Sequence, residues 1–368
     1  MEKIFDTIDR CRICNNSYLV EILNLGVQPP ANSLYEVGTS KPQNVPLRLM
    51  FCKKCSTVQL GEDVDPEYLF GKYLWVTGTS KTALIYCERF TSKALENTNN
   101  EKPFIVEVAS NDGTFLKQFQ NSGCKVLGVD PAKNIAEIAT INGIPTIADF
   151  FTRDLAQDLL SKHQSADIVY ARNVIPHVKG IHSVIDGIKT LMDDEGVGII
   201  EFHNAELLLE ELHYDYIYHE HLFYYTLTAI DYLLNKHGLY VFDIMESPIS
   251  GGSWVVYFSK EHRDKTEALK ETQSHDVGPQ DNLFKKWMEF VRNAKKHADK
   301  LSSMVKNEVS KNGKLIAYGS SARSSTLLNY CGLTSDHISV VIDKNPLKRG
   351  LLTAGSNIPI VSYIDGVN

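Results

Sequence analysis

The sequence predicts an α/β protein with a doubly wound parallel sheet, a small metal-binding module before it and a second, similar α/β domain after it. Three observations support this prediction. Two CxxC pairs lie near the N-terminus, short apolar runs alternate with helical patterns between residues 104 and 202, and a strand, a small-residue turn and a helix recur from residue 314. The 368 residues allow three domains, which we place at 1–75, 76–260 and 261–368.

Charge and hydropathy exclude several classes of protein. The formal net charge is −7, whereas nucleic-acid binding requires a basic face. No apolar run approaches the ~20 residues of a membrane-spanning helix, and the polar N-terminus is unlike a signal peptide. We therefore expect a cytoplasmic enzyme, a monomer or a small homo-oligomer, that binds neither nucleic acid nor membrane.

Four of the seven cysteines form the two CxxC pairs, Cys11 with Cys14 and Cys52 with Cys55. Each pair turns two thiolates toward one point, and two pairs complete a tetrahedral zinc site. Because no ligand position stays open, we expect structural Zn²⁺. Redox-active or surface turns remain the alternative.

The segment between the cysteine pairs contains Leu25–Asn32, a loop rich in turn formers. A loop held by a metal cluster could present Gln28 and Asn32 to a ligand, although an ordinary surface loop is equally compatible. The aromatic stretch Asp65–Thr79 links this module to the next domain and could line its cleft. Ser80 is placed to cap a helix that runs to Asn97.

The first strand of the central domain leads into the most informative turn of the chain. The apolar run Phe104–Val106 is followed by Glu107, a small-residue turn that ends at Gly113, and a helix from Thr114. Ligands of doubly wound sheets bind at this crevice. The turn is not GxGxxG, so it does not predict a diphosphate cradle. An early acid with one late glycine resembles motif I of class I S-adenosylmethionine (SAM) methyltransferases.

Further strands follow in order. The second, Lys125–Asp130, ends in an acid where one commonly meets ribose hydroxyls. We expect strands at Pro145–Ile147, Ala166–Tyr170 and Gly196–Phe202, and two more, perhaps antiparallel, at Leu239–Ile244 and Gly251–Tyr257. Asp149 and Phe150 could hold an adenine ring, or Asp149 could cap a helix while the phenylalanines pack in the core.

The block Tyr214–Thr226 places His219, Glu220 and His221 among six aromatic residues. Apolar surroundings shift pKa values, and a histidine beside a glutamate is suited to accept a proton. A metal site at the two histidines and a solvated turn with packed tyrosines are the alternatives.

The C-terminal part repeats the opening pattern after a charged segment, Lys260–Gln280. Apolar spacing predicts a long amphipathic helix over Leu283–Val309. A strand then reaches the turn Gly319–Ala322, where backbone N–H groups and Arg323 could bind a phosphate or diphosphate. Another strand, Ser339–Asp343, follows. Because a doubly wound sheet rarely ends after about three strands, we expect this domain to be incomplete.

Together these motifs resemble the SAM-dependent C-3 methyltransferases of nucleotide-linked 4-keto-deoxysugars. The resemblance covers nearly the whole chain and rests on the CxxC pairs with the GVQPPAN loop, EVASNDGTFL, GVDPA, RNVIPHV, YIYHEH, YGSSARSSTLLNY and IDKNP. It implies a class I methyltransferase Rossmann-like sheet and a C-terminal Rossmann-like domain that binds the nucleotide-sugar.

The resemblance also implies a mechanism, in which C3 of a nucleotide-diphospho-4-keto-6-deoxysugar is deprotonated and the enolate is methylated. His221 would be the base, with Glu220 orienting it or acting instead, and Tyr218 would hydrogen-bond the enolate oxygen. His177 and Tyr73 would lie in the cleft. The implied SAM-binding residues are Glu107, Ala109, Asn111, Gly113, Asp130, Pro131, Asp149, Phe150 and Asn173. The implied substrate-binding residues are Gln28, Asn32, Gly319, Ser321, Arg323 and Asp343.

Two other functions are compatible with the sequence. The enzyme could methylate another carbon acid or a sugar hydroxyl, or the chain could bind a sugar nucleotide without catalysis.

Overall fold

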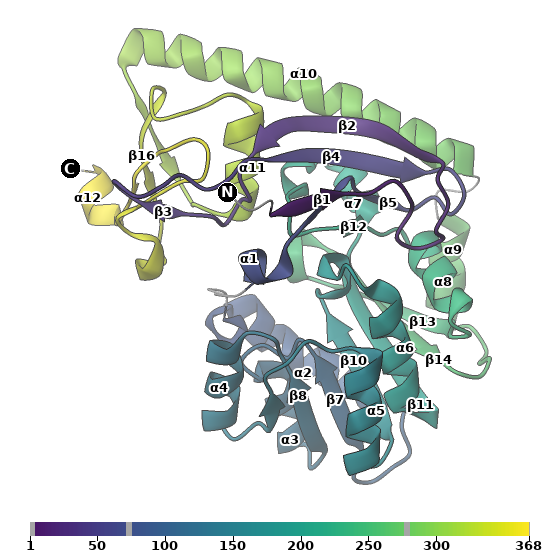
Figure 1. The fold of residues 1–368 in the computed structure, drawn as a ribbon. Coiled ribbons are helices and arrows are strands. Elements are labelled where there is room, and N and C mark those ends of the chain that lie inside the picture. The colour runs from purple at the N-terminus through teal and green to yellow at the C-terminus, as the bar shows by residue number, and fades with distance from the viewer. Residues whose placement is uncertain (1–3, 71–75, 276–279, 368) are drawn as a thin grey trace.

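The computed structural model describes residues 4–70, 76–275 and 280–367. The central domain is a seven-stranded sheet with strand order β13-β14-β11-β10-β7-β8-β9 (Figure 1). Strand β14 is antiparallel to both β11 and β13, and the other pairs of neighbouring strands in this sheet are parallel. The strands are β7 (Phe104–Val108), β8 (Lys125–Val129), β9 (Thr146–Ile147), β10 (Ala166–Arg172), β11 (Met192–His203), β13 (Tyr240–Ser247) and β14 (Ser253–Ser259). The predicted doubly wound sheet and its antiparallel extension are confirmed.

Helices join these strands and cover the sheet (Figure 1). They are α2 (Lys81–Leu95), α3 (Thr114–Asn121), α4 (Lys133–Ile141), α5 (Arg153–Lys162), α6 (Ile181–Leu191), α7 (Ala205–Glu210) and α8 (Leu227–Lys236). The predicted cap is confirmed, because the Ser80 hydroxyl accepts the Ala83 N–H at the start of α2.

The N-terminal module is built on antiparallel pairs. Strands β2 (Leu19–Gln28), β4 (Val45–Cys52) and β5 (Val58–Leu60) share one sheet, and β1 (Phe5–Thr7) pairs with β6 (Glu62–Val64). The expectation of a loop over Leu25–Asn32 is wrong for its first half, which belongs to β2. Gly26, with a φ of +85°, lies where the β2–β4 register shifts, so this turn former makes a bulge inside a strand.

Two short pairings connect the modules. Strand β12 (Phe223–Tyr224), directly after the His219–His221 block, adds to β5 of the N-terminal sheet. Strand β3 (Tyr35–Glu36) pairs with β17 (Leu351–Leu352) of the C-terminal domain. The N-terminal module therefore contacts both other domains through backbone hydrogen bonds.

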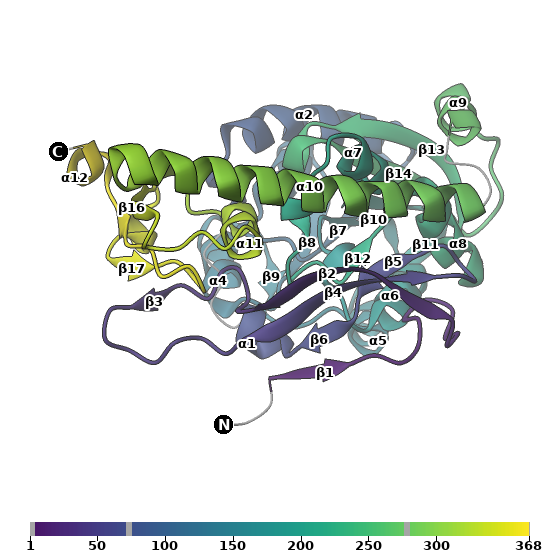
Figure 2. The same cartoon turned by 90° about the horizontal axis from the view of Figure 1, so that it is seen from above.

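The predicted amphipathic helix is α10 (Gln280–Asn312), which lies along β2 and β4 (Figures 1 and 2). Its buried residues follow the expected spacing: Leu283, Trp287, Phe290, Ala294 and Ala298. Before it, α9 (Glu267–His275) packs on β13, and Thr266 Oγ1 donates to Asp243 Oδ1 at 2.7 Å. The boundary at residue 260 stays a prediction.

The C-terminal domain has a parallel three-stranded sheet in the order β15-β16-β18, from β15 (Leu315–Tyr318), β16 (Ile338–Ile342) and β18 (Ile360–Val361). Helix α11 (Ala322–Tyr330) follows β15, and α12 (Tyr363–Val367) follows β18. The short helix α1 (Pro66–Phe70) precedes the central domain.

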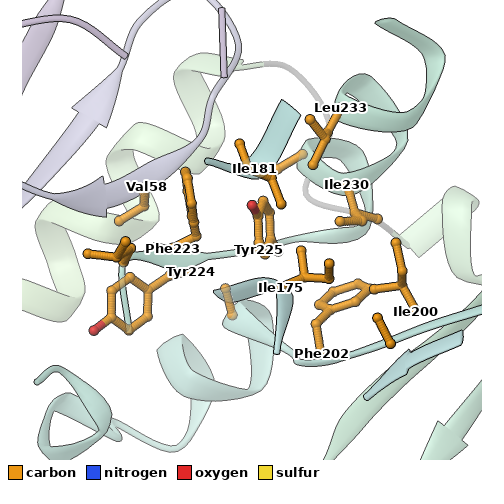
Figure 3. Packing of buried hydrophobic residues seen from close by; sticks show 14 of the residues in the cluster. Val58, Ile175, Ile181, Ile200, Phe202, Phe223, Tyr224, Tyr225, Ile230 and Leu233 are labelled. Carbon is orange, nitrogen blue, oxygen red and sulfur yellow. The ribbon is translucent and has the colours of Figure 1, made fainter. Parts of the chain in front are cut away.

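One hydrophobic cluster extends through all three modules. Figure 3 shows Val58 of β5 beside Phe223 and Tyr224, and Tyr225 close to Ile181 of α6. Because the modules share a core, their relative positions are fixed by packing as well as by strand pairing. Within the described residues, no helix has the length and apolar character needed to cross a membrane.

Candidate functional site

A cavity of about 1510 Å³ lies at the carboxyl ends of the central parallel strands and is lined by residues of all three modules. The N-terminal module supplies Pro30 and residues 32–34, and the C-terminal domain supplies Ser321 with residues 343–348. Ligands of open α/β sheets bind at this edge. The cavity is therefore the candidate active site.

The turn after β7 forms one wall of the cavity. Ala109, Asn111 and Gly113 all have positive φ values, of 55°, 51° and 76°. This left-handed backbone folds the chain back before α3 begins at Thr114. The tight turn brings Ala109, Ser110 and Asn111 onto the cavity surface.

Asp130, which follows β8, holds this turn. Its carboxylate accepts the Asn111 N–H at 2.8 Å through Oδ2 and the Ala132 N–H at 2.9 Å through Oδ1. Burial nevertheless raises the pKa of Asp130. The carboxylate lies on the cavity wall, where it can also accept hydrogen bonds from a ligand's hydroxyls.

Glu107 lies beneath the turn and is 2% exposed. The Tyr170 hydroxyl donates to its Oε2 at 2.9 Å, while Arg172 is 4.0 Å from Oε1 and is closer to Glu201, at 2.8 Å. Burial raises the pKa of Glu107 to about 8, against the lowering effects of Arg172 and Tyr170. A buried carboxyl group that shares Arg172 with the closer Glu201 suits a ligand that carries positive charge.

These features fit SAM, whose methionine amine and sulfonium are cationic and whose ribose carries two hydroxyls. Glu107 would face the positive charge, and Asp130 would accept from the ribose. The left-handed turn lets backbone approach the ligand closely. Pro131, Phe150 and Asn173 also line this part of the cavity.

Glu220, within the block Tyr214–Thr226, is another buried carboxyl group that lines the cavity. It is 5% exposed, and Asn32 of the N-terminal module donates Nδ2–H to its Oε1 at 2.6 Å. Burial raises the pKa of Glu220 to about 7, although the Asn32 hydrogen bond lowers it. A carboxylate with a pKa near neutrality is suited to take a proton from carbon.

His221 and Tyr218 form a hydrogen-bonded pair. His221 Nδ1 is 3.1 Å from the Tyr216 carbonyl, so Nδ1 carries the proton, and Nε2 accepts the Tyr218 hydroxyl at 2.8 Å. Burial, reinforced by His177 and His203, holds the pKa of His221 well below its usual range. His221 is therefore neutral, and it is a weaker base at neutral pH than Glu220.

His177 and His219 hold this block through contacts between their ring nitrogens and backbone carbonyl groups. His177 Nδ1 is 2.7 Å from the Glu220 carbonyl oxygen, and its ring meets that of His221 edge-on. His219 Nε2 lies 3.2 Å from the Pro46 carbonyl and is 1% exposed. The block is buried, so the alternative of a solvated turn is wrong. In the described part of the chain, neither His219 nor His221 belongs to a group of potential metal ligands.

The turn after β15 reaches the other end of the cavity. Asp343 accepts the Ser320 N–H at 2.7 Å and the Asn345 N–H at 2.8 Å. Lys348 Nζ lies 3.9 Å from this carboxylate. Ser321 caps α11 with a capping box, and both Ser321 and Lys348 line the cavity. Helix N-terminal N–H groups with a nearby lysine can bind phosphate oxygens.

The structure brings most predicted site residues together. The cavity wall includes Asn32, Glu107, Ala109, Asn111, Asp130, Pro131, Phe150, Asn173, His177, Tyr218, Glu220, His221, Ser321 and Asp343. Tyr73 lies outside the described residues. The individual roles of all these residues stay predictions.

Five predicted residues do not line the cavity. Gln28 is buried in β2, where its Nε2 donates to the Leu25 carbonyl. Gly113 precedes α3 and faces Ile144, and the Gly319 N–H donates to Ile342. Asp149 is exposed and accepts the Phe150 N–H, and Arg323 pairs with Asp215.

The interpretation of Asp149 as a helix cap with both phenylalanines in the core is partly wrong, whereas the adenine-binding interpretation stays a prediction. Thr152, not Asp149, caps α5, and only Phe151 is in the core, whereas Phe150 is 46% exposed. The sequence reasoning also missed cavity-lining residues. Among them are Arg172 and His203, which end β10 and β11, and Lys344 and Lys348, which follow β16. Their positions at the carboxyl ends of strands could have identified them.

The four cysteines of the CxxC pairs lie together, with all Sγ atoms within 4.8 Å of one another. The Cys11–Cys55 and Cys14–Cys52 sulfur distances are 3.6 and 3.5 Å. Tetrahedral zinc with ~2.3 Å bonds to sulfur spaces its ligands by about 3.8 Å. The cluster therefore fits a structural zinc ion. Its Ile13 carbonyl accepts Lys236 Nζ at 2.7 Å, which ties the cluster to α8.

Three family models match the chain. The model described as "Putative zinc binding domain" matches residues 11–70, "Methyltransferase domain" matches 83–244 and "C-methyltransferase C-terminal domain" matches 248–365. A curated relative, the C-methyltransferase NovU of Streptomyces niveus, is 29% identical over 371 residues, which cover 98% of this chain and 87% of the relative.

Solved structures are similar to part of this chain. Magnesium protoporphyrin IX methyltransferase (ChlM) from Synechocystis PCC 6803 with bound SAM has 12% identity and a TM-score of 0.38, over 48% of this chain and 79% of that one. A TehB-like SAM-dependent methyltransferase from Corynebacterium glutamicum has 16% identity and a TM-score of 0.37, over 48% and 89%.

Proposed function

Because the chain belongs to the SAM-dependent C-methyltransferases that carry an N-terminal zinc-binding module, we propose that its acceptor is a nucleotide-diphospho-4-keto-6-deoxysugar. The new carbon–carbon bond forms at C3, beside the C4 ketone. One observation supports this most: a buried carboxyl group with a pKa of about 7, Glu220, lines the same cavity as Glu107 and Asp130.

Glu220 is the base in this proposal. The C4 ketone acidifies the C3–H bond, Glu220 takes the proton, and the electron pair becomes the enolate. The Asn32 amide keeps the carboxylate in place through Oε1. His221 is less suited to this role, because its pKa is held well below the usual range.

Tyr218 stabilises the enolate oxygen. Its hydroxyl donates to His221 Nε2 in the free protein, and a ketone oxygen placed beside it competes for the same proton. That hydrogen bond strengthens as negative charge develops on the oxygen, which is the condition for lowering the barrier. In the free protein this hydrogen bond to His221 holds the Tyr218 oxygen in place, and the hydroxyl leaves His221 when it donates to the ketone.

SAM supplies an electrophilic methyl group, whose bond to sulfur breaks as the bond to C3 forms. Glu107, Asp130 and the turn between them would hold it. The diphosphate of the acceptor would lie against Ser321, Lys344 and Lys348, where two lysines and the start of α11 line the cavity. This arrangement places the sugar between the SAM site and the diphosphate site of the cavity.

The decisive experiment is incubation of the protein with SAM and a panel of dTDP-, GDP- and CDP-linked 4-keto-6-deoxysugars, read by mass spectrometry. We expect a gain of one methyl group, located at C3 by NMR. Loss of deuterium from C3 without SAM would test the base separately. Methylation at oxygen or at another carbon acid, or no reaction with any 4-keto sugar, would overturn the proposal.

A further inference from the structure

The segment Tyr214–Ile217, directly before Tyr218, is held by side chains of the C-terminal domain. Four consecutive residues, Tyr214 to Ile217, precede Tyr218, and each contacts a side chain of α10 or α11. The Tyr214 hydroxyl is 2.9 Å from His297 Nδ1, and Thr326 Oγ1 donates to the Ile217 carbonyl at 3.0 Å. The two residues between them, Asp215 and Tyr216, both contact Arg323.

Arg323 makes a fork-shaped contact that only a guanidinium can make. Its Nε and Nη2 lie 2.8 and 3.2 Å from the two carboxylate oxygens of Asp215. The same group lies 4.0 Å from the centre of the Tyr216 ring. A bidentate pair combined with stacking fixes both partners in orientation. Arg323 does not line the cavity.

Tyr216 transmits this restraint to His221. Its carbonyl accepts the proton of His221 Nδ1 at 3.1 Å, which leaves Nε2 to accept from Tyr218. Its ring also stacks on His203 at 4.3 Å, and its hydroxyl donates to the Ser250 carbonyl. Every group of Tyr216 therefore has a fixed partner, and Arg323 is the one from the C-terminal domain.

We propose that Arg323 is a positioning residue: through Asp215 and Tyr216 it holds the carbonyl that fixes the tautomer of His221, and hence the hydrogen bond that places the Tyr218 hydroxyl until the ketone replaces His221 as its acceptor. The inference rests on the proposed function, since it assigns a role in the same reaction. It goes beyond it by making the C-terminal domain part of the catalytic apparatus as well as a substrate-binding surface.

The kinetic test compares Arg323→Ala and Arg323→Lys with Arg349→Ala. Arg349 is an exposed arginine of the same domain outside the cavity wall. We expect Arg323→Ala to lower kcat by about 10- to 100-fold with acceptor KM and SAM affinity changed less than about threefold, because displacement of a catalytic group costs rate rather than binding. Arg323→Lys should recover part of the rate, and Arg349→Ala should match wild type.

The opposite pattern would overturn the inference. If Arg323→Ala raised acceptor KM and left kcat unchanged, Arg323 would be a substrate ligand. Should Arg323→Ala fail to fold, Asp215→Asn breaks the same ionic pair and keeps the arginine, so its kcat decides in the same way.

A second readout does not depend on turnover. In protein labelled with ¹⁵N-histidine, NMR should show His221 protonated at Nδ1 in the wild type and a mixture of tautomers in Arg323→Ala. An unchanged His221 signal would overturn the inference even if the activity fell. If the wild type methylated no 4-keto sugar, the proposed function would fail, and the tautomer measurement would still decide the role of Arg323.

Discussion

The chain contains two strand-turn-helix units with one hydrogen-bonding pattern and two different uses. In the central domain, Asp130 accepts the N–H of the turn residue Asn111 and of the residue two positions after itself. In the C-terminal domain, Asp343 accepts the N–H groups of Ser320 and Asn345 in the same way. In both units, an aspartate directly after the second strand therefore accepts an N–H group of the turn that follows the first strand.

The units differ in what surrounds the turn. All five residues of β7 are buried, and Glu107 supplies a carboxyl group under the turn. Strand β15 has two exposed apolar residues, Ile316 and Tyr318, and carries no acid. The first unit is thus equipped to bind a cation, whereas the second offers lysines and a helix start. The same backbone pattern serves opposite ligand charges because the nearby side chains differ.

In the proposed function the proton transfer belongs to neither unit but to the segment between them, so the largest effect should come from Glu220. We expect Glu220→Gln to lower the rate of C3–H exchange by at least about 100-fold, because general-base catalysis is worth roughly that much. In the wild type this rate should rise with pH through about 7, as Glu220 loses its proton. Deuterium exchange followed by NMR measures both.

Glutamine keeps the oxygen that accepts from Asn32, so SAM affinity and melting temperature should stay close to wild type. A Glu220→Gln protein that exchanged C3–H normally would return the base assignment to His221.

The second prediction concerns the two aspartates that accept N–H groups of the turns. In each of them, one carboxylate oxygen is replaced by an amide nitrogen. Asp130→Asn and Asp343→Asn are matched substitutions, because each keeps one carboxyl-like oxygen for the turn. We expect Asp130→Asn to weaken SAM binding by about 10-fold or more, since it removes the charge facing the ribose. Asp343→Asn should leave SAM affinity unchanged and raise acceptor KM. Calorimetry with SAM and steady-state kinetics separate the two, and equal effects on SAM would contradict the comparison.

The third prediction concerns pH. Because the pKa of Glu107 is raised to about 8, SAM affinity should increase as the pH rises from 6 and level off above about 8, by at most about tenfold per pH unit. The same shift means that the contribution of Glu107 to the stability of the free protein is complete below about 4.5 and is lost as pH rises through about 8.

Glu107→Gln should remove the pH dependence of SAM affinity in calorimetric titrations, and it should reduce the pH dependence of the melting temperature, to which Glu220 still contributes. Acceptor binding at the second unit, which has no such acid, should not follow this profile. A pH-independent SAM affinity in the wild type would show that Glu107 does not meet the cationic part of the ligand.

The parts of the fold that depend on local pattern were predictable, and those that depend on distant pairing were not. Apolar runs ending in Glu107 and Asp130 identified β7 and β8, because a buried strand leaves that signature in a few adjacent residues. Strands β12 and β3 are two residues long, too short for any periodicity. They exist because another module lies beside them.

The same limit applies to the site. Asn32 and Glu220 are 188 positions apart, and Arg323 and Asp215 are 108 apart. Residue type suggested that Asn32 and Arg323 could bind a ligand and that Glu220 could take part in catalysis, but only the folded chain gives their partners. For Arg323 the partner is a carboxylate of the chain itself, which satisfies the charge that sequence reasoning assigned to a diphosphate.

The smallest predicted effect distinguishes the two turns by their glycines. Gly113 and Gly319 have similar positive φ values, 76° and 89°, so alanine at either position should cost about 1–2 kcal/mol of left-handed strain. A Cβ at Gly113 would also lie 3.0 Å from the Ile144 side chain, whereas one at Gly319 meets nothing within 4 Å. Gly113→Ala should therefore destabilise by about 1 kcal/mol more, because overpacking adds to strain. Urea unfolding monitored by fluorescence measures the difference. Equal losses would mean that Ile144 moves without cost, and that the buried turn is no more tightly packed than the exposed one.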